Sequence, residues 1–145
     1  MKLAIREAKK VKGPKRFGAI VVKNGKIIAR GHNTTYETND PATCAEINAV
    51  RNAAKKLGSR KLDRCTIYAT GESCLMCTGA ILKARIKRIV VGFSHHDYNK
   101  LDGRKELNPW SRHMKEIVPN DVKFKIGVLR KECMDVMFNP KYLES

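Results

Sequence analysis

The spacing of apolar residues along the chain switches between the period of a helix and that of a strand. Residues 1–12 place apolar side chains three to four positions apart, which predicts a short surface helix ended by a Gly-Pro pair. Residues 17–22 and 26–30 are β-branched runs on either side of the Asn-Gly dipeptide at 24–25. Because this dipeptide accepts the positive φ angles of a tight turn, we expect the sheet to begin with an antiparallel hairpin.

The next periodic segment predicts a long amphipathic helix. Residues 45–57 repeat apolar side chains at helical spacing until a glycine ends the pattern. Asp40 and Pro41 suit an N-cap and a first-turn position, and Thr43 is a second candidate cap. Residues 44–46 are therefore expected at the first turn of this helix.

The second half of the chain alternates between strand and helix patterns. Residues 65–69 predict a strand, 74–84 a helix and 87–93 a buried strand, which together indicate a β-α-β unit. Residues 94–119 have mixed polarity, so we expect a long loop there with one short helix at 110–116.

The pattern near the end of the chain predicts a last strand at residues 124–129 and a closing helix at 130–138. Strands and helices that alternate in this way favour an α/β fold. At 145 residues the chain has the length of one domain with a sizeable core. We therefore expect a single domain over residues 1–145, in which a mixed central sheet has helices on both faces.

Composition indicates the cellular location and the state of the cysteines more than it indicates the activity. No apolar run is long enough for a membrane span, and the start lacks the apolar core of a secretory signal, so we expect a cytoplasmic protein. Five cysteines in such a chain favour metal ligation or buried thiols over disulfides. The formal net charge of +16 would concentrate anions such as nucleotides or RNA, yet a solvated basic surface explains it equally well.

Two local clusters carry the candidate chemistry. Cys44 and Glu46 lie at the expected start of one helix, and Cys74 and Cys77 lie at the expected start of another. A helix N-terminus favours thiolates, and two cysteines three positions apart share a helical face. Three thiols would leave the fourth position of a tetrahedral zinc ion open, which is typical of a catalytic site. Glu46 points in a different direction from Cys44 and suits a proton carrier.

These residues resemble the motif of the cytidine deaminase-like superfamily of zinc-dependent nucleobase and nucleoside deaminases. The resemblance runs from Phe17 to Gly92 and is greatest to the guanine deaminase, cytosine deaminase and tRNA adenosine deaminase branches. Two positions depart from the motif: Ser73 replaces the usual proline, and Cys44 stands where these branches usually have histidine. The resemblance implies a three-layer α/β/α fold, one zinc ion per chain and a homodimer.

The resemblance also implies a reaction and a set of site residues. Cys44, Cys74 and Cys77 would hold the zinc ion. Glu46 would move protons while zinc-bound hydroxide attacks the amino-bearing ring carbon and ammonia leaves. Substrate contacts are expected at the four positions Asn33, Phe17, Ser73 and His95, although Phe17 also suits a core aromatic and His95 a surface loop.

Four functions stay open on the sequence alone. The leading hypothesis is a deaminase of a free nucleobase or nucleoside, similar to guanine or cytosine deaminases. A transfer-RNA adenosine deaminase shares the chemistry and would use the positive charge. A zinc module that binds RNA without catalysis would leave Glu46 unexplained, and a thiol oxidoreductase using Cys74 and Cys77 would leave both Cys44 and Glu46 unexplained.

Overall fold

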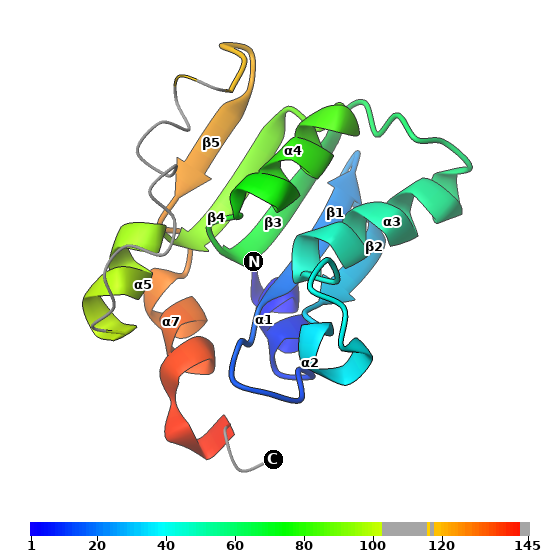
Figure 1. The fold of residues 1–145 in the computed structure, drawn as a ribbon. Coiled ribbons are helices and arrows are strands. Elements are labelled where there is room, and N and C mark those ends of the chain that lie inside the picture. The colour runs from blue at the N-terminus through cyan, green and yellow to red at the C-terminus, as the bar shows by residue number, and fades with distance from the viewer. Residues whose placement is uncertain (103–115, 117, 143–145) are drawn as a thin grey trace.

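The computed structural model describes residues 1–102, 116 and 118–142 (Figure 1). Five strands form one sheet: β1 (Gly18–Lys23), β2 (Lys26–His32), β3 (Cys65–Gly71), β4 (Arg88–Phe93) and β5 (Lys123–Ile126). The helices are α1 (Lys2–Ala8), α2 (Thr35–Thr38), α3 (Ala45–Leu57), α4 (Leu75–Lys83), α5 (His95–Asp102), α7 (Arg130–Phe138) and the 3-10 helix η2 (Pro140–Tyr142). None of the helices in these described ranges combines the length and apolar character needed to cross a membrane.

The sheet is mixed, as the sequence predicts. Its strand order is β2-β1-β3-β4-β5, with β1 antiparallel to β2 and β3, and with β3, β4 and β5 parallel. The hairpin between β1 and β2 turns at Asn24 and Gly25, whose φ angles are 50° and 73°. Two successive positive φ angles match the tight turn expected of an Asn-Gly pair. The β3-α4-β4 segment is the predicted β-α-β unit.

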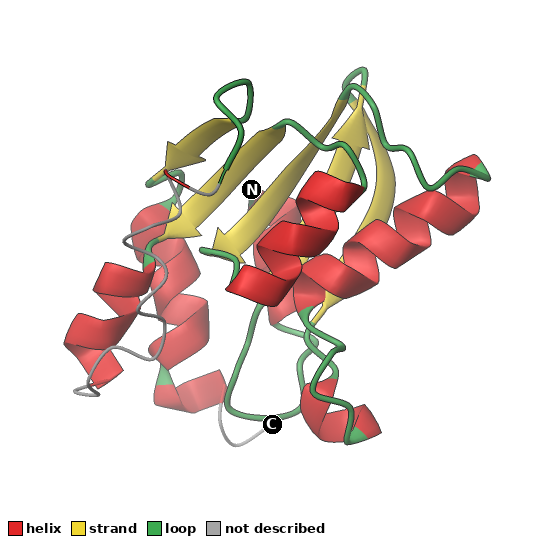
Figure 2. Cartoon of the chain, turned by 45° about the horizontal axis from the view of Figure 1, so that its top comes forward, coloured by secondary structure: helices red, strands yellow, loops and turns green. Residues whose placement is uncertain are grey.

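Helices cover both faces of the sheet, which confirms the three-layer α/β/α architecture (Figures 1 and 2). On one face α3 packs against β1, β2, β3 and α4. On the other face α1 packs against β1, β2 and β3, while α7 packs against β3 and β4. Fully buried side chains such as Ile67, Ile81 and Val91 fill the layer under α3 and α4. The sheet therefore holds the first turns of α3 and α4 at fixed positions.

A glycine sets the close approach of α3 to the sheet. Gly31 lies in β2 directly under the first turns of α3. A Cβ atom added there would lie 2.4 Å from both the Ala45 carbonyl oxygen and the Ala49 nitrogen. Only a residue without a side chain leaves room for that helix backbone, so Gly31 helps to place Cys44 and Glu46.

The structure corrects the expected loop after β4, the expected cap of α3 and the bounds of the last strand. The loop predicted over 94–119 is in fact helical at α5, and residues 110–116 lie outside the described part except for Glu116. Ser94 and Asp97 form a capping box, in which the Asp97 amide donates to Ser94 Oγ at 3.2 Å and the Ser94 amide donates to Asp97 Oδ2 at 2.9 Å. The expected cap of α3 at Asp40 and Pro41, or Thr43, is wrong too.

The N-cap of α3 is Cys44 itself. Asp40 instead accepts a hydrogen bond from the Ala42 amide at 2.8 Å, which belongs to the turn before the helix. The last strand also differs from its expected bounds, because Leu129 has a φ of 52° and forms the N-cap of α7. The strand that remains, β5, lies at the edge of the sheet and all four of its side chains are exposed.

Candidate active site

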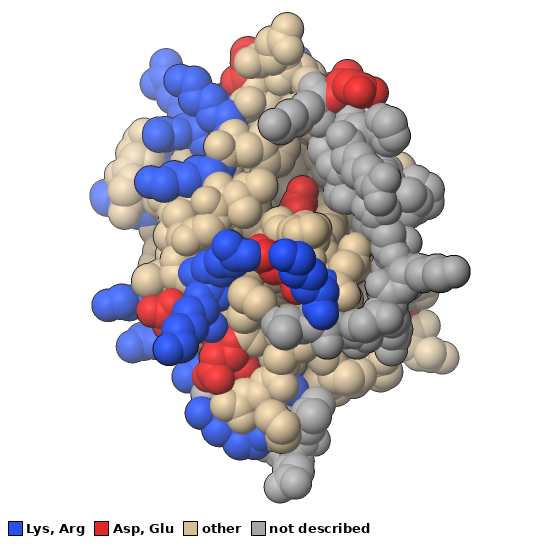
Figure 3. All heavy atoms as spheres, turned by 90° about the vertical axis from the view of Figure 1, so that its left-hand side faces the viewer, with Lys and Arg blue, Asp and Glu red and all other residues tan. Residues whose placement is uncertain are grey.

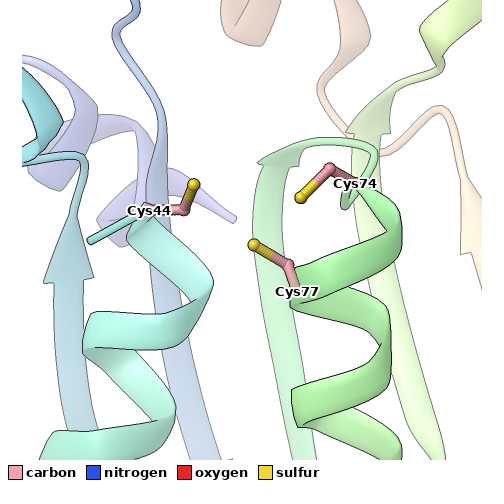
Figure 4. Close-up of side chains that lie close together, drawn as sticks. All are labelled: Cys44, Cys74 and Cys77. Atoms are coloured by element: carbon pink, nitrogen blue, oxygen red, sulfur yellow. The ribbon is translucent and has the colours of Figure 1, made fainter. Parts of the chain in front are cut away.

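Three cysteine sulfurs from two helix starts point into one shared space (Figure 4). Cys44 is the N-cap of α3, Cys74 is the N-cap of α4, and Cys77 lies in the first turn of α4. Their Sγ atoms all lie within 4.8 Å of one another. Tetrahedral zinc with bonds of about 2.3 Å would hold sulfurs roughly 3.8 Å apart, so the three thiols fit one zinc ion after small side-chain movements.

Hydrogen bonds among the three thiols divide their protonation. The pKa of Cys74 is well below its usual range, because Cys44 and Cys77 both donate hydrogen bonds to its sulfur. The pKa values of Cys44 and Cys77 are raised, the first mainly by its hydrogen bond to Cys74 and the second mainly by its hydrogen bond with Cys44. Of the three thiols, that of Cys74 therefore loses its proton most readily.

Glu46 lies beside this cluster in the first turn of α3 and is only 5% exposed. Burial raises the pKa of its carboxyl group to about 7. The Cys74 charge raises it further, whereas a hydrogen bond from the backbone opposes the shift. A carboxyl group of this kind can take up and release a proton near neutral pH.

The cysteines and Glu46 line a cavity of about 470 Å³. This volume falls within the range of small-molecule sites and is large enough for a nucleobase or nucleoside. Three of the four expected substrate contacts, Asn33, Phe17 and His95, also line it. The structure thus gathers most of the predicted site residues around one cavity.

The side chain of Asn33 is held in place by the backbone on both sides. Its Nδ2 atom donates to the Lys15 carbonyl at 2.8 Å, and its Oδ1 atom accepts from the Thr35 amide at 3.1 Å. An amide group offers two donors and two acceptor lone pairs, so these two bonds leave one of each unused at a residue that lines the cavity.

Phe17 and His95 each have a second role in the structure. The ring of Phe17 lines the cavity and also packs against Phe93 and Tyr98, with ring centroids 6.0 and 6.4 Å apart. The backbone amide of His95 donates to Glu72 Oε2 at 2.8 Å, and His95 Nε2 lies 3.2 Å from the Ser73 carbonyl oxygen. Both residues are therefore fixed in place beside the cavity.

Ser73 is the one predicted contact that does not line the cavity. Its side chain is buried, and its hydroxyl group lies close enough to the Glu46 carboxyl group to oppose the rise of that group's pKa. The carbonyl oxygen of Ser73 accepts from Thr78 Oγ1 at 3.5 Å, next to its contact with His95. Ser73 thus joins the start of α4 to the start of α5.

Further cavity-lining residues were missed by the sequence analysis, among them Lys15, Tyr36 and Glu72. Glu72 follows the last residue of β3 and stands two positions before Cys74, so an acidic residue this close to the cysteine pair was an available signal. Lys15 and Tyr36 come from segments without a motif, and only the folded chain shows that they meet at the cavity.

Residues 1–93 match the family of the cytidine and deoxycytidylate deaminase zinc-binding region. A tRNA-specific adenosine deaminase of Buchnera aphidicola is 35% identical over 142 residues, which are 96% of this chain and 89% of that protein. A guanine deaminase of Bacillus subtilis is 47% identical over 81 residues, or 56% of this chain and 52% of that protein.

A tRNA-specific adenosine deaminase of Aquifex aeolicus is 40% identical over 92 residues, and the match spans 62% of this chain and 61% of that protein. A solved structure of a deaminase that edits adenosine to inosine at the wobble position of transfer RNA has a TM-score of 0.74. It is 28% identical and matches 94% of this chain and 96% of its own. The chain belongs to the zinc-binding cytidine and deoxycytidylate deaminase family.

Proposed function

We propose that this protein is a hydrolytic deaminase that replaces a ring amino group of a nucleobase with oxygen and releases ammonia. The observation that carries the proposal is the meeting of three thiols and one buried carboxyl group on the wall of a cavity of nucleoside size. Cys44, Cys74 and Cys77 would hold zinc, which supplies Lewis acidity there and lowers the pKa of water.

The protein's own groups would handle the protons and the substrate. Glu46 takes a proton from water as the oxygen attacks the amino-bearing carbon, and it passes protons to the ring nitrogen and then to the leaving ammonia. One carbon–oxygen bond forms, one carbon–nitrogen bond breaks, and water supplies both the oxygen and the protons. The free donor and acceptor of Asn33 would orient the base while Phe17 provides an apolar wall.

Adenosine in RNA is the substrate we favour. The relative named as a tRNA-specific adenosine deaminase matches this chain over nearly its whole length, beyond the motif region. The net charge of +16 suits a polyanion. Figure 3 shows Lys and Arg side chains over the left half and centre of one face, with acidic side chains scattered between them.

A free base or nucleoside is the second candidate substrate, and it was the leading hypothesis from sequence. Its support is the 47% identity to a guanine deaminase over 81 residues, which is the higher local identity of the two. The cavity volume accommodates either kind of substrate.

Ammonia release by the zinc-loaded protein would test the proposal across free bases, nucleosides and an adenosine-containing anticodon stem-loop. We expect turnover of the stem-loop to exceed that of any free base. Glu46→Gln should keep one zinc ion per chain and lose at least about 10²-fold in turnover. Glu132→Gln, the same change at an exposed first-turn position of α7, should retain full activity. Equal activity of Glu46→Gln and wild type would contradict the mechanism.

The expected domain and assembly belong to the same proposal. A single domain over residues 1–145 should unfold in one cooperative transition. A homodimer should show twice the chain mass of 16.4 kDa in light scattering, and a mass of one chain would refute it.

A further inference from the structure

Two segments of the chain form one side of the cavity and are tied to each other. The first is residues 13–17, before β1, and the second is α2. The side chain of Asn33 bridges them through its hydrogen bonds to the Lys15 carbonyl and the Thr35 amide. Gly13 lies against the Tyr36 ring, since a Cβ atom added to it would be 3.1 Å from Tyr36 Cγ. The segments are therefore held as one unit.

This unit presents a cation and an aromatic ring where the cavity meets solvent. Lys15 lines the cavity with an exposed side chain, and it makes no ion pair with any residue of the described ranges. Tyr36 also lines the cavity and is 57% exposed, one of the large hydrophobic side chains left open to solvent. We name this pair, Lys15 and Tyr36, the entrance subsite.

A neighbouring buried cation adds to the positive potential there. Arg16 is only 3% exposed, and its Nη1 atom has no hydrogen-bond partner within the part of the chain that the structure describes. A guanidinium group stays protonated even when buried, and Arg16 forms no ion pair with a carboxylate among the residues that the structure describes. Lys15 therefore offers an ammonium group to an anion at this side of the cavity, and the Arg16 charge adjoins it in the chain.

Resting on the proposed function, we infer that the entrance subsite binds the nucleotide that adjoins the reacting base in a single-stranded nucleic acid. The Lys15 ammonium pairs with a backbone phosphate, and the Tyr36 ring stacks on the neighbouring base. A free base fills only the interior of the cavity and leaves both groups unused. A mononucleotide would supply the phosphate but has no second base for Tyr36, so the pair of groups favours a strand.

Binding can be measured separately from turnover by fluorescence anisotropy of a labelled anticodon stem-loop on zinc-loaded protein carrying Glu46→Gln. In that background we expect Lys15→Gln to weaken binding about tenfold and to lower the slope of log affinity against log salt by about 0.7, the value for one single-stranded phosphate. Lys26→Gln is the matched control, because it also removes one exposed lysine charge. Lys26 begins β2, whereas the cavity-lining residue Asn33 follows the opposite end of that strand, so affinity should stay nearly unchanged.

Substitutions of Tyr36 separate stacking from charge. Tyr36→Leu should weaken binding about tenfold without changing the salt slope, and Tyr36→Phe, which keeps the ring, should bind like the wild-type residue. Equal losses for Lys15→Gln and Lys26→Gln would overturn the phosphate contact, and full affinity of Tyr36→Leu would overturn the stacking contact.

Two further results distinguish this inference from the proposed function. If adenosine 5′-monophosphate binds as tightly as the stem-loop, with the same dependence on Lys15, the subsite serves a mononucleotide and the strand inference is wrong. If Lys15→Gln and Tyr36→Leu keep full stem-loop affinity while the wild-type protein releases ammonia from a substrate, only the entrance subsite is refuted. Absence of ammonia from every substrate would refute the proposed function instead, whatever the binding data.

Discussion

Replacing Gly31 with alanine should damage both the stability and the metal site of this protein. The new Cβ atom would lie 2.4 Å from two backbone atoms of α3, whereas ordinary contact begins at 3.4 Å. The helix must therefore rise from β2 by roughly 1 Å, because neither backbone atom can rotate away as a side chain could. Overpacking of a core costs about 1–3 kcal/mol, and we expect about 3 kcal/mol here because the clash is with a whole helix.

The same displacement would move Cys44 relative to the cysteines of α4. A shift of about 1 Å is large beside a zinc–sulfur bond of about 2.3 Å, so we expect zinc affinity to fall roughly 10–100-fold. Urea unfolding at fixed zinc concentration should show a midpoint lowered by about 1.5 M, for a slope near 2 kcal/mol per M. Competition with a chelator would measure the change in zinc affinity.

Gly79→Ala is the matched control for this experiment. Gly79 lies in α4, and an added Cβ atom would meet nothing within 4 Å. Alanine should there raise the free energy of unfolding by about 0.5–1 kcal/mol, because it restricts the unfolded chain and favours a helix. If Gly31→Ala unfolded within about 0.5 kcal/mol of wild type and bound zinc equally well, the argument from helix displacement would be refuted.

The remaining predictions concern the thiols and the core. Zinc binding near neutral pH should release about two protons, because Cys44 and Cys77 have raised pKa values and Cys74 has a lowered one. Calorimetry in buffers of different ionisation enthalpy would count the released protons. Release of none would contradict the hydrogen bonds among the thiols. Cys133 is buried with its pKa raised to about 12 from 9.0, so at pH 8 its alkylation should be about 10³-fold slower than in the unfolded chain, as mass spectrometry would show; rapid labelling would refute this. Leu62→Ala at a fully buried position should lower the free energy of unfolding in urea by about 2–5 kcal/mol. A loss below about 1 kcal/mol would show that neighbouring side chains move into the space that the leucine leaves.

Long elements with strong periodicity could be predicted from the sequence almost to the residue. The bounds of α3 and α7 agree with the expected 45–57 and 130–138. Gly58 ends α3 in the left-handed region, with a φ of 60°, which is the usual end of a helix at glycine. Periodicity and an end signal pointed to the same boundary, and that agreement explains the accuracy.

Elements defined by short polar signals were harder to predict. The helix α5 was expected as loop because His95, His96 and Asp97 are polar, yet the Ser94 and Asp97 capping box was present in the sequence. The cap of α3 was misplaced because Cys44 caps the helix through its position and makes no side-chain hydrogen bond to it. Capping propensities favour Ser, Thr, Asp and Asn, so they do not predict a cysteine as the N-cap.

The candidate site also has one part that the sequence predicts and one part that it does not. The four groups that resemblance supplied, the three cysteines and Glu46, do meet at one cavity. The entrance subsite could not be predicted, because Lys15 and Tyr36 approach each other only through the Asn33 bridge and the contact at Gly13. Walls of a cavity come from tertiary packing, and no local pattern in the sequence records them.

The exposed strand β5 has a consequence for how the protein behaves in a crowded solution. An edge strand with open backbone groups is a template on which another chain can add and start an aggregate. Here Lys123 and Lys125 alternate with Phe124 and Ile126, and all four side chains are exposed. A second copy arriving at this edge would bring its own lysines against these two, and their repulsion opposes growth of the sheet from chain to chain. Addition of a second chain at this edge is thus disfavoured, although Phe124 and Ile126 leave apolar surface exposed there.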